Sequence, residues 1–255
     1  MASFLITGTS RGLGLALVQE LSSRPESEVS RIFAAVRGDS SSLDDVVKKS
    51  AGRVSVLKLD VTSKESIKAA AVEVEKQLGD KGLDVLINNA GVCHYEFDGV
   101  KSMEKLADSM NINVYGVHWT TRAFLPLLRK GQLKKVVSFG TTLSSITLAP
   151  SMTFALCPAY KISKAAMEAL MVQYALDHEK EGFSFIIVCP GWLQTDLGGG
   201  DMADLTAEEG AKASLDIILK PGQEYNGKMP KVFVEGWENG KPGKRNVYDG
   251  SNVPW

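Results

Sequence analysis

The stretch Phe4-Leu5-Ile6-Thr7-Gly8-Thr9-Ser10-Arg11-Gly12-Leu13-Gly14 runs from a short apolar segment into one with helical spacing. Gly8, Gly12 and Gly14 let the backbone turn tightly and approach a pyrophosphate, and the next helix offers its first N–H groups and a positive dipole. The spacing is not Gly-x-Gly-x-x-Gly, and an ordinary tight turn without a ligand is the alternative. The place of the turn, between the first strand and the first helix, favours dinucleotide binding.

Outward from this turn, short apolar runs alternate with longer stretches of helical periodicity. The runs are nearly continuous, which is typical of parallel strands covered on both faces. The predicted strands are Phe4–Ile6, Ile32–Val36, Val54–Leu59, Leu83–Ile87, Val136–Phe139, Phe183–Val188 and Val232–Val234, and the predicted helices are Leu13–Leu21, Leu43–Lys49, Ser63–Leu78 (capped by Thr62 or Ser63), Lys101–Arg129, Ala159–Lys180 and Ala207–Leu219. This order predicts an α/β fold: one doubly wound Rossmann-type domain over residues 1–255, with a seven-stranded parallel sheet and helices on both faces.

Composition excludes several classes of protein. The chain has 29 Lys+Arg against 30 Asp+Glu, so no net charge favours nucleic acid or an anionic membrane. Cys93, Cys157 and Cys189 form no Cys-x-x-Cys pair, and the three histidines lack ligand spacing, so we expect no metal. No signal peptide or apolar run of roughly 20 residues is present, and we expect a cytoplasmic protein with reduced thiols.

The end of the second predicted strand indicates which cofactor is bound. A carboxylate there usually holds the ribose 2′-OH of NAD, but this strand ends on Arg37. A guanidinium suits a 2′-phosphate, and Arg11 in the glycine turn would add a second cation. The alternative is that Arg37 is a solvated loop residue and that Asp39 takes the ribose. We expect NADP(H).

Tyr160 and Lys164 lie four residues apart and therefore share one face of a helix. Reduction of a ketone leaves an oxyanion that needs a proton, and a phenol can supply it. A neighbouring ammonium would lower the phenol's pKa from about 10 toward neutrality. The alternative is a plain surface pair on a helix.

The motifs together resemble the short-chain dehydrogenase/reductase family over almost the whole chain. They are Thr7-Gly8 to Gly14, Asp60-Val61, Asn88-Asn89-Ala90-Gly91, Asn113-Val114-Tyr115-Gly116, Tyr160 to Lys164, and Pro190-Gly191-Trp192 with Thr195-Asp196. Residues 195–209 and the ending Tyr248-Asp249-Gly250 with Pro254-Trp255 are similar to the C-factor-like or sniffer-like carbonyl reductases. Fungal ketoreductases of secondary metabolism are similar too.

The resemblance implies a role for each matching residue. Tyr160 would be the proton donor, Lys164 would lower its pKa and hold the nicotinamide ribose, and Asn113 would anchor a water in a proton relay. Asp60 would accept a hydrogen bond from the adenine amino group, and Thr195 would hold the carboxamide. The implied cofactor-binding set is Gly8, Ser10, Arg11, Gly12, Leu13, Gly14, Arg37, Asp60, Val61, Asn89, Ala90, Gly91, Tyr160, Lys164, Pro190, Gly191 and Thr195.

The hydroxyl that polarises the carbonyl departs from the family pattern. Relatives often read Ser-Ser-x-x-Gly-Ser-Ile after the fifth strand, whereas this chain reads Gly140-Thr141-Thr142-Leu143-Ser144-Ser145-Ile146. Matching the Ser-Ile ends places Thr141 at the catalytic serine, with Ser144 and Ser145 as alternatives. An insertion then lies between Ser145 and Pro158.

Downstream segments bear on the substrate. Residues 196–210 are predicted to form a glycine-hinged lid, and the tail 236–255 either docks or is partly disordered. Candidate pocket walls are His94, Tyr95, Leu148, Met152, Phe154, Trp192 and Met202, which favour a small apolar or aromatic carbonyl compound. We expect a homodimer or homotetramer that pairs through the helices at 101–129 and 159–180. The alternative functions are a catalytically dormant NADP-binding sensor or scaffold, and a dehydratase, epimerase or isomerase on the same fold.

Overall fold

A computed structural model describes residues 1–255 and shows a parallel six-stranded sheet in the order β3-β2-β1-β4-β5-β6. The strands are β1 (Ala2–Thr7), β2 (Val29–Val36), β3 (Val54–Lys58), β4 (Val85–Asn88), β5 (Lys135–Phe139) and β6 (Ser184–Val188). The chain moves outward from β1 to β3 and then returns to the other side of β1 to form β4. Ligands of doubly wound sheets bind at the carboxyl ends of the strands beside this reversal.

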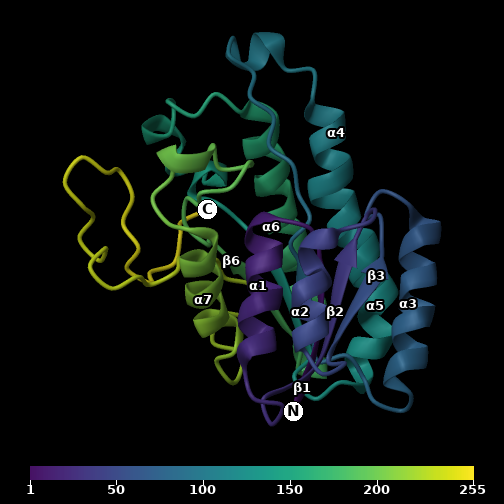
Figure 1. Cartoon of the computed structure of the whole chain (residues 1–255). Helices are drawn as coiled ribbons and strands as arrows, with labels where there is room; N and C mark the ends of the chain where they lie inside the picture. The colour runs from purple at the N-terminus through teal and green to yellow at the C-terminus, as the bar shows by residue number, and fades with distance from the viewer.

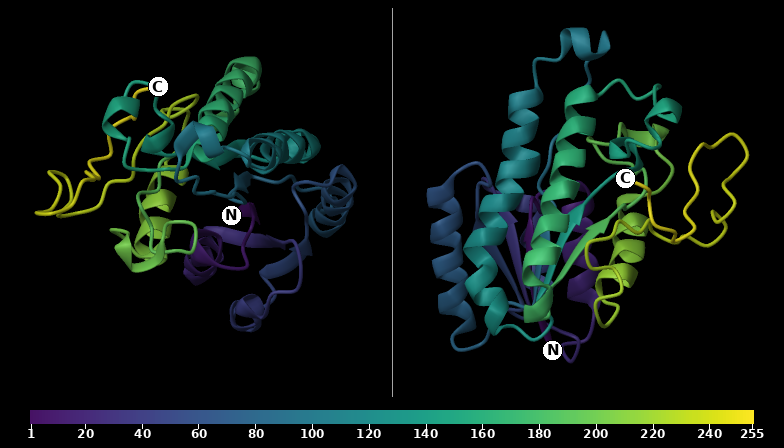
Figure 2. Two further views of the ribbon diagram at one scale, coloured as in Figure 1. Left: turned by 90° about the horizontal axis from the view of Figure 1, so that it is seen from above. Right: turned by 180° about the vertical axis from the view of Figure 1, so that it is seen from behind.

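Helices cover both faces of the sheet, as the apolar strands predict (Figure 1). One face carries α1 (Gly12–Ser23), α2 (Asp44–Lys49) and α7 (Ala207–Ile218), and the other carries α3 (Lys64–Leu78), α5 (Val117–Lys130) and α6 (Pro158–His178). The view from above in Figure 2 shows the sheet between these two layers. Each layer closes a separate apolar core against its own face of the sheet.

Local sequence signals fix where two helices begin. Ser63 caps α3, because its hydroxyl accepts a 3.1 Å hydrogen bond from the Ser66 backbone N–H. Thr206 and Glu209 form a reciprocal capping box at the start of α7. The predicted helix boundaries otherwise agree with the structure to within about two residues, except for the region 101–129.

The predicted seventh strand, Val232–Val234, is wrong. The backbone N–H of Val232 bonds to the Cys189 carbonyl beyond β6, whereas the N–H of Val234 bonds to the Tyr248 carbonyl in the C-terminal tail. The segment divides its hydrogen bonds between two partners and forms only isolated bridges. An apolar run therefore appears in the sequence without a continuous ladder in the structure.

The predicted single helix over 101–129 is also corrected. A short 3-10 turn, η2 (Gly99–Ser102), comes first, and a break separates it from α4 (Leu106–Met110). A π-helical segment, η3 (Asn111–Gly116), then joins α4 to α5, and the three form one continuous rod (Figure 1). A Cβ added at Gly116 would lie 3.0 Å from Val61, so the rod approaches the loop after β3 closely at this point.

The C-terminal tail docks on the body of the protein. Trp237, Tyr248 and Val253 are buried, although part of the tail loops outward (Figure 1). This decides between the docked and the partly disordered alternatives in favour of docking. No helix in the structure combines the length and the apolar character that crossing a membrane would require.

Candidate active site

The glycine turn has the open geometry of an anion site. Gly8 and Gly12 adopt φ values of +70° and +56°, which residues with a Cβ rarely adopt. A Cβ on Gly14 would lie 2.3 Å from the Gly8 carbonyl oxygen, so no larger residue fits there. The first turn of α1 has no side-chain cap and no acidic residue. Its N–H groups are therefore available to a phosphate, and the turn fits a dinucleotide.

Asp60 and Arg37 lie close enough to interact at the ends of β3 and β2. Burial acts to raise the pKa of Asp60, but hydrogen bonds from Thr62 and the charge of Arg37 outweigh it, so the pKa falls below the usual value. Thr62 donates to Oδ1 of Asp60 through both its backbone N–H and its hydroxyl. Oδ2 has no partner in the chain and can accept from an amino group, as the adenine assignment requires.

Residues 88–91, which follow β4, hold the glycine turn through hydrogen bonds. The Asn89 side-chain amide donates to the carbonyls of Thr7 and Gly8, at 2.9 Å and 3.0 Å. Its Nδ2 is therefore used to hold the turn rather than presented to a ribose. The backbone N–H of Ala90 donates to the Thr7 hydroxyl, and a Cβ on Gly91 would lie 3.8 Å from Lys164 Nζ. This loop thus connects the glycine turn to Lys164.

Arg11 pairs with Asp196 in the chain without cofactor. Its guanidinium lies 3.0 Å from the carboxylate of Asp196, and both side chains are more than three-quarters exposed. Exposed pairs contribute about 0–1 kcal/mol, so a phosphate could displace Asp196 at little cost. Arg37 is also exposed. Neither guanidinium is committed to a buried contact.

Tyr160 and Lys164 are brought together on the inner face of α6. Both are buried, and Lys164 Nζ lies 5.8 Å from the Tyr160 ring centroid. Nζ donates a 2.7 Å hydrogen bond to the Phe139 carbonyl at the end of β5. A surface pair, the alternative for this spacing, is excluded by the burial.

Burial changes the acidity of both groups. It lowers the pKa of Lys164 from 10.5 to about 8, and it raises the pKa of Tyr160 well above its usual value. The predicted lowering of the Tyr160 pKa is therefore not found in the chain alone, because burial of the phenol raises it. The phenol therefore carries its proton at neutral pH, although the raised pKa makes it a weaker acid than a free phenol.

The three candidate hydroxyls differ in what they already bind. Ser145 Oγ donates to the Pro254 carbonyl at 2.5 Å and accepts from the Leu148 N–H. Ser144 Oγ is held between the Thr141 carbonyl and Glu168. Thr141 Oγ1 only accepts, from the Leu143 N–H at 3.2 Å, and its hydrogen has no acceptor in the chain. Thr141 is therefore the hydroxyl that is free to donate.

Asn113 lies in the π-helical segment and is almost completely buried. Its side-chain amide exchanges two hydrogen bonds with the backbone of Val92 and donates a third to Ser163 Oγ at 3.0 Å. Ser163 belongs to α6, between Tyr160 and Lys164. Asn113 thus fixes the loop after β4 against α6, and its amide nitrogen has no hydrogen left for a water.

The segment after β6 closes over the glycine turn. Gly191 has a φ of +88°, and a Cβ added at Gly12 would lie 3.2 Å from Thr195 Cγ2. The predicted lid at 196–210 is anchored rather than loose: Trp192 Nε1 donates to the Gly198 carbonyl at 2.7 Å. The tail also holds it, because the Tyr248 hydroxyl donates to Asp204 at 2.8 Å.

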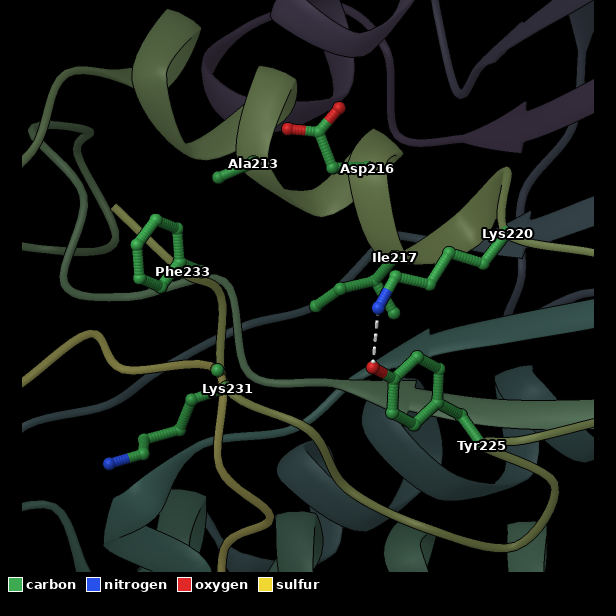
Figure 3. Close-up of a pocket in the computed structure, with 8 residues that line it drawn as sticks. Ala213, Asp216, Ile217, Lys220, Tyr225, Lys231 and Phe233 are labelled. Carbon is green, nitrogen blue, oxygen red and sulfur yellow. Dashed lines mark hydrogen bonds between the residues drawn. The ribbon is translucent and has the colours of Figure 1, made fainter. Parts of the chain in front are cut away.

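The candidate pocket walls separate into two groups. Tyr95, Phe154, Trp192 and Met202 are exposed large apolar residues. His94 instead pairs with Asp108 at 2.8 Å, Leu148 packs against the core, and Met152 uses its carbonyl to accept from Lys161. A separate hollow beside α7, lined by Lys220, Tyr225 and Phe233 among others, contains none of the predicted site residues (Figure 3).

Sequence reasoning missed Glu168. It is 2% exposed and contacts the loop that carries Thr141. Its spacing of four from Lys164 and eight from Tyr160 places it on the same helix face, and that spacing was the available signal.

Residues 3–206 match the family described as short chain dehydrogenase. The short-chain dehydrogenase/reductase atnB of Arthrinium sp is 33% identical over 243 residues, which cover 90% of this chain and 87% of that protein. The NADPH-bound carbonyl reductase from chicken fatty liver superposes with a TM-score of 0.84 at 25% identity, covering 100% of this chain and 99% of that one. Carbonyl reductase Sniffer of D. melanogaster gives a TM-score of 0.83 at 26% identity over 100% of both chains.

Proposed function

The chain belongs to the short-chain dehydrogenase family, and on that premise we propose that it is an NADPH-dependent reductase that converts a ketone or another carbonyl into a secondary alcohol. The family makes it an oxidoreductase of the NAD(P)-dependent class, as the sequence resemblance implies. The observation that carries the proposal is the buried Tyr160 and Lys164 pair on α6. The Thr141 hydroxyl, which has no acceptor in the chain, supplements it.

Each group has a distinct task in this proposal. When bound, reduced nicotinamide supplies the hydride that the carbonyl carbon accepts. The Tyr160 phenol gives its proton to the carbonyl oxygen, and the Lys164 ammonium stabilises the tyrosinate that remains. The Thr141 hydroxyl donates a hydrogen bond to the same oxygen and polarises the carbonyl. Asn113 holds the loop after β4 against the helix that carries Tyr160 and Lys164.

NADPH is proposed over NADH because of the cations at the turn. Arg37 follows β2, where a ribose 2′-phosphate would lie, and its side chain is exposed. Arg11 would exchange Asp196 for the phosphate. The structural relative from chicken liver was solved with NADPH bound. The other groups proposed to hold the cofactor are the N–H groups of α1, Asp60, Gly191 and Thr195.

The surface around the proposed centre suits an apolar substrate. Tyr95, Phe154, Trp192 and Met202 each expose more than a third of their side chain. Exposed apolar side chains of this kind are typical of surfaces that bind apolar ligands. We also propose a homodimer or homotetramer that pairs through the helical regions 101–129 and 159–180.

The test is consumption of NADPH, and separately of NADH, by the purified protein against ketones, quinones and aldehydes. We expect turnover with NADPH and much less with NADH. Tyr160→Phe is the matched control, and it should abolish turnover while NADPH binding, followed by fluorescence, stays intact. Full activity in Tyr160→Phe would sink the mechanism. Tight NADPH binding without turnover of any compound would favour the dormant sensor instead.

A further inference from the structure

Glu168 brings a carboxyl group into the interior beside the proposed centre. It lies on α6, is 2% exposed, and bonds through Oε1 to Ser144 Oγ in the loop after β5. A Cβ added at Gly140 would lie 3.0 Å from Oε1, so the glycine leaves the space that this carboxyl occupies. Burying a carboxyl group lowers the stability of the fold unless hydrogen bonds or an opposite charge compensate for the lost hydration.

The Ser144 hydroxyl has two close oxygen neighbours but only one hydrogen. Its Oγ lies 2.5 Å from the Thr141 carbonyl oxygen and is also in contact with Glu168 Oε1. A hydroxyl has one hydrogen, and oxygens this close need a hydrogen between them. The Thr141 carbonyl can only accept. Both contacts are hydrogen bonds only if the Ser144 hydroxyl donates to the Thr141 carbonyl and the Glu168 carboxyl carries a proton that it donates to Ser144.

We propose that Glu168 is a positioning residue that works in its neutral form: its carboxylic acid donates to Ser144, Ser144 donates to the Thr141 carbonyl, and this chain holds the loop against α6. The effect is to fix the Thr141 hydroxyl relative to Tyr160 and Lys164, which lie on the same helix as Glu168. The inference rests on the proposed function, because Thr141 is useful only if a carbonyl is reduced. Glu168 itself touches no reacting atom.

The titratable groups that face Glu168 bear on the pH at which its carboxyl group loses its proton. Burial raises the pKa of Glu168 to about 7, and a hydrogen bond from the Thr141 backbone and the charge of Lys164 partly offset this effect. The groups facing it are Tyr160 and Lys164 on α6 and Cys189 after β6. Burial raises the pKa of Tyr160 and of Cys189, and the pKa of Lys164 is about 8. Glu168 therefore changes its protonation state near neutral pH, and Lys164 loses its proton in the adjacent range.

The first experiment compares the dependence of kcat on pH in four proteins with saturating NADPH. In wild type, kcat should fall as the pH rises past 7, because ionised Glu168 can no longer donate. Glu168→Gln keeps an N–H donor toward Ser144 and should keep the low-pH kcat through neutral pH, with a fall only where Lys164 loses its proton, near pH 8. Glu168→Ala and Ser144→Ala should have, at every pH, a kcat about tenfold below the low-pH value of wild type, with an unchanged KM for NADPH. An equal loss in Glu168→Gln and Glu168→Ala, or no loss in Glu168→Ala, would overturn the proposal.

A second experiment needs no substrate and tests the proton directly. Infrared difference spectra between wild type and Glu168→Gln should contain the carbonyl stretch of a protonated carboxyl below pH 7 that fades above it. Absence of that band below pH 7 would overturn the inference even if the enzyme is active. Presence of the band in a protein that reduces no carbonyl would leave the neutral acid standing and remove the proposed function.

Discussion

The Nζ atom of Lys164 donates a 2.7 Å hydrogen bond to the carbonyl oxygen of Phe139, the last residue of β5. This bond joins α6 to the carboxyl edge of the sheet. It also holds the ammonium below the Tyr160 ring, 5.8 Å from its centroid. The position of Lys164 is therefore set by the backbone of the sheet rather than by another side chain.

Loss of Lys164 should remove catalysis more than folding. We expect Lys164→Ala to lower kcat by about 10²–10⁴-fold, because Tyr160 loses the charge that stabilises its conjugate base. The measurement is steady-state NADPH oxidation with the best substrate of the panel. Lys212→Ala, an exposed position on α7, is the matched control and should leave kcat unchanged. A loss below fivefold in Lys164→Ala would contradict the assignment.

Thr141 and Ser145 should separate into a catalytic and a structural hydroxyl. Thr141→Ala should lower kcat by about 100-fold, since it removes the only one of the three hydroxyls whose hydrogen is free. Ser145→Ala should leave kcat close to wild type but lower the free energy of unfolding by about 1–3 kcal/mol, because the Leu148 N–H loses its acceptor and the Pro254 carbonyl its donor. Thr141→Ser is the control that should retain activity. The reverse pattern would move the donor role to Ser145.

Arg37 should decide the preference between the two nicotinamide cofactors. Arg37→Ala should raise the KM for NADPH by about tenfold or more and leave the KM for NADH unchanged, because only NADPH carries the 2′-phosphate. Asp39→Ala tests the alternative and should change neither KM. An increased KM for NADH in Asp39→Ala, with no effect of Arg37→Ala, would indicate an NAD enzyme.

Local patterns predicted those parts of the protein whose partners lie nearby in the sequence. The spacing of Tyr160 and Lys164 on one helix and the placement of the glycine turn after β1 are of this kind. Val232–Val234 is different, because its hydrogen bonds go to Cys189 and Tyr248 on separate segments. An apolar run cannot reveal that its ladder will be divided.

The hydroxyl donor could not be chosen from the sequence for a similar reason. The Ser145 hydroxyl donates to the carbonyl of Pro254, which lies 109 residues further along the chain. The π-helical segment around Asn113 likewise depends on Val92 and Ser163, which pack against it from other elements. Glu168 was visible at a helical spacing from Lys164, but an acidic residue on a helix is most often solvated.

The C-terminal tail should stabilise the segment at 196–210 through Tyr248. The Tyr248 hydroxyl accepts from the Trp192 N–H at 3.2 Å and donates to Asp204 at 2.8 Å, so it links the two ends of the segment that covers the glycine turn. Tyr248→Phe should lower the free energy of unfolding by about 1–3 kcal/mol and raise the substrate KM. Unfolding in urea and steady-state kinetics provide the two readings. An unchanged KM together with reduced stability would assign the contact to folding alone.

The buried carboxyl of Glu168 should also make stability depend on pH, independently of catalysis. Its pKa rises from 4.5 to about 7 on folding, mainly because of burial. Between these values the unfolded chain has released the proton while the folded chain still holds it. The folded state then binds more protons, so the free energy of unfolding falls as the pH rises through this window, by up to about 3 kcal/mol from this group.

Glu168→Gln removes that linkage. The variant should therefore become more stable relative to wild type as the pH rises from 4.5 to about 7, with no further change above it. Urea unfolding at constant ionic strength measures the difference, and Glu26→Gln, an exposed carboxyl, is the control that should show no such trend. A difference between wild type and Glu168→Gln that is flat across the window would mean that the carboxyl ionises as readily in the folded chain as in water, and the neutral acid beside Ser144 would then have no basis.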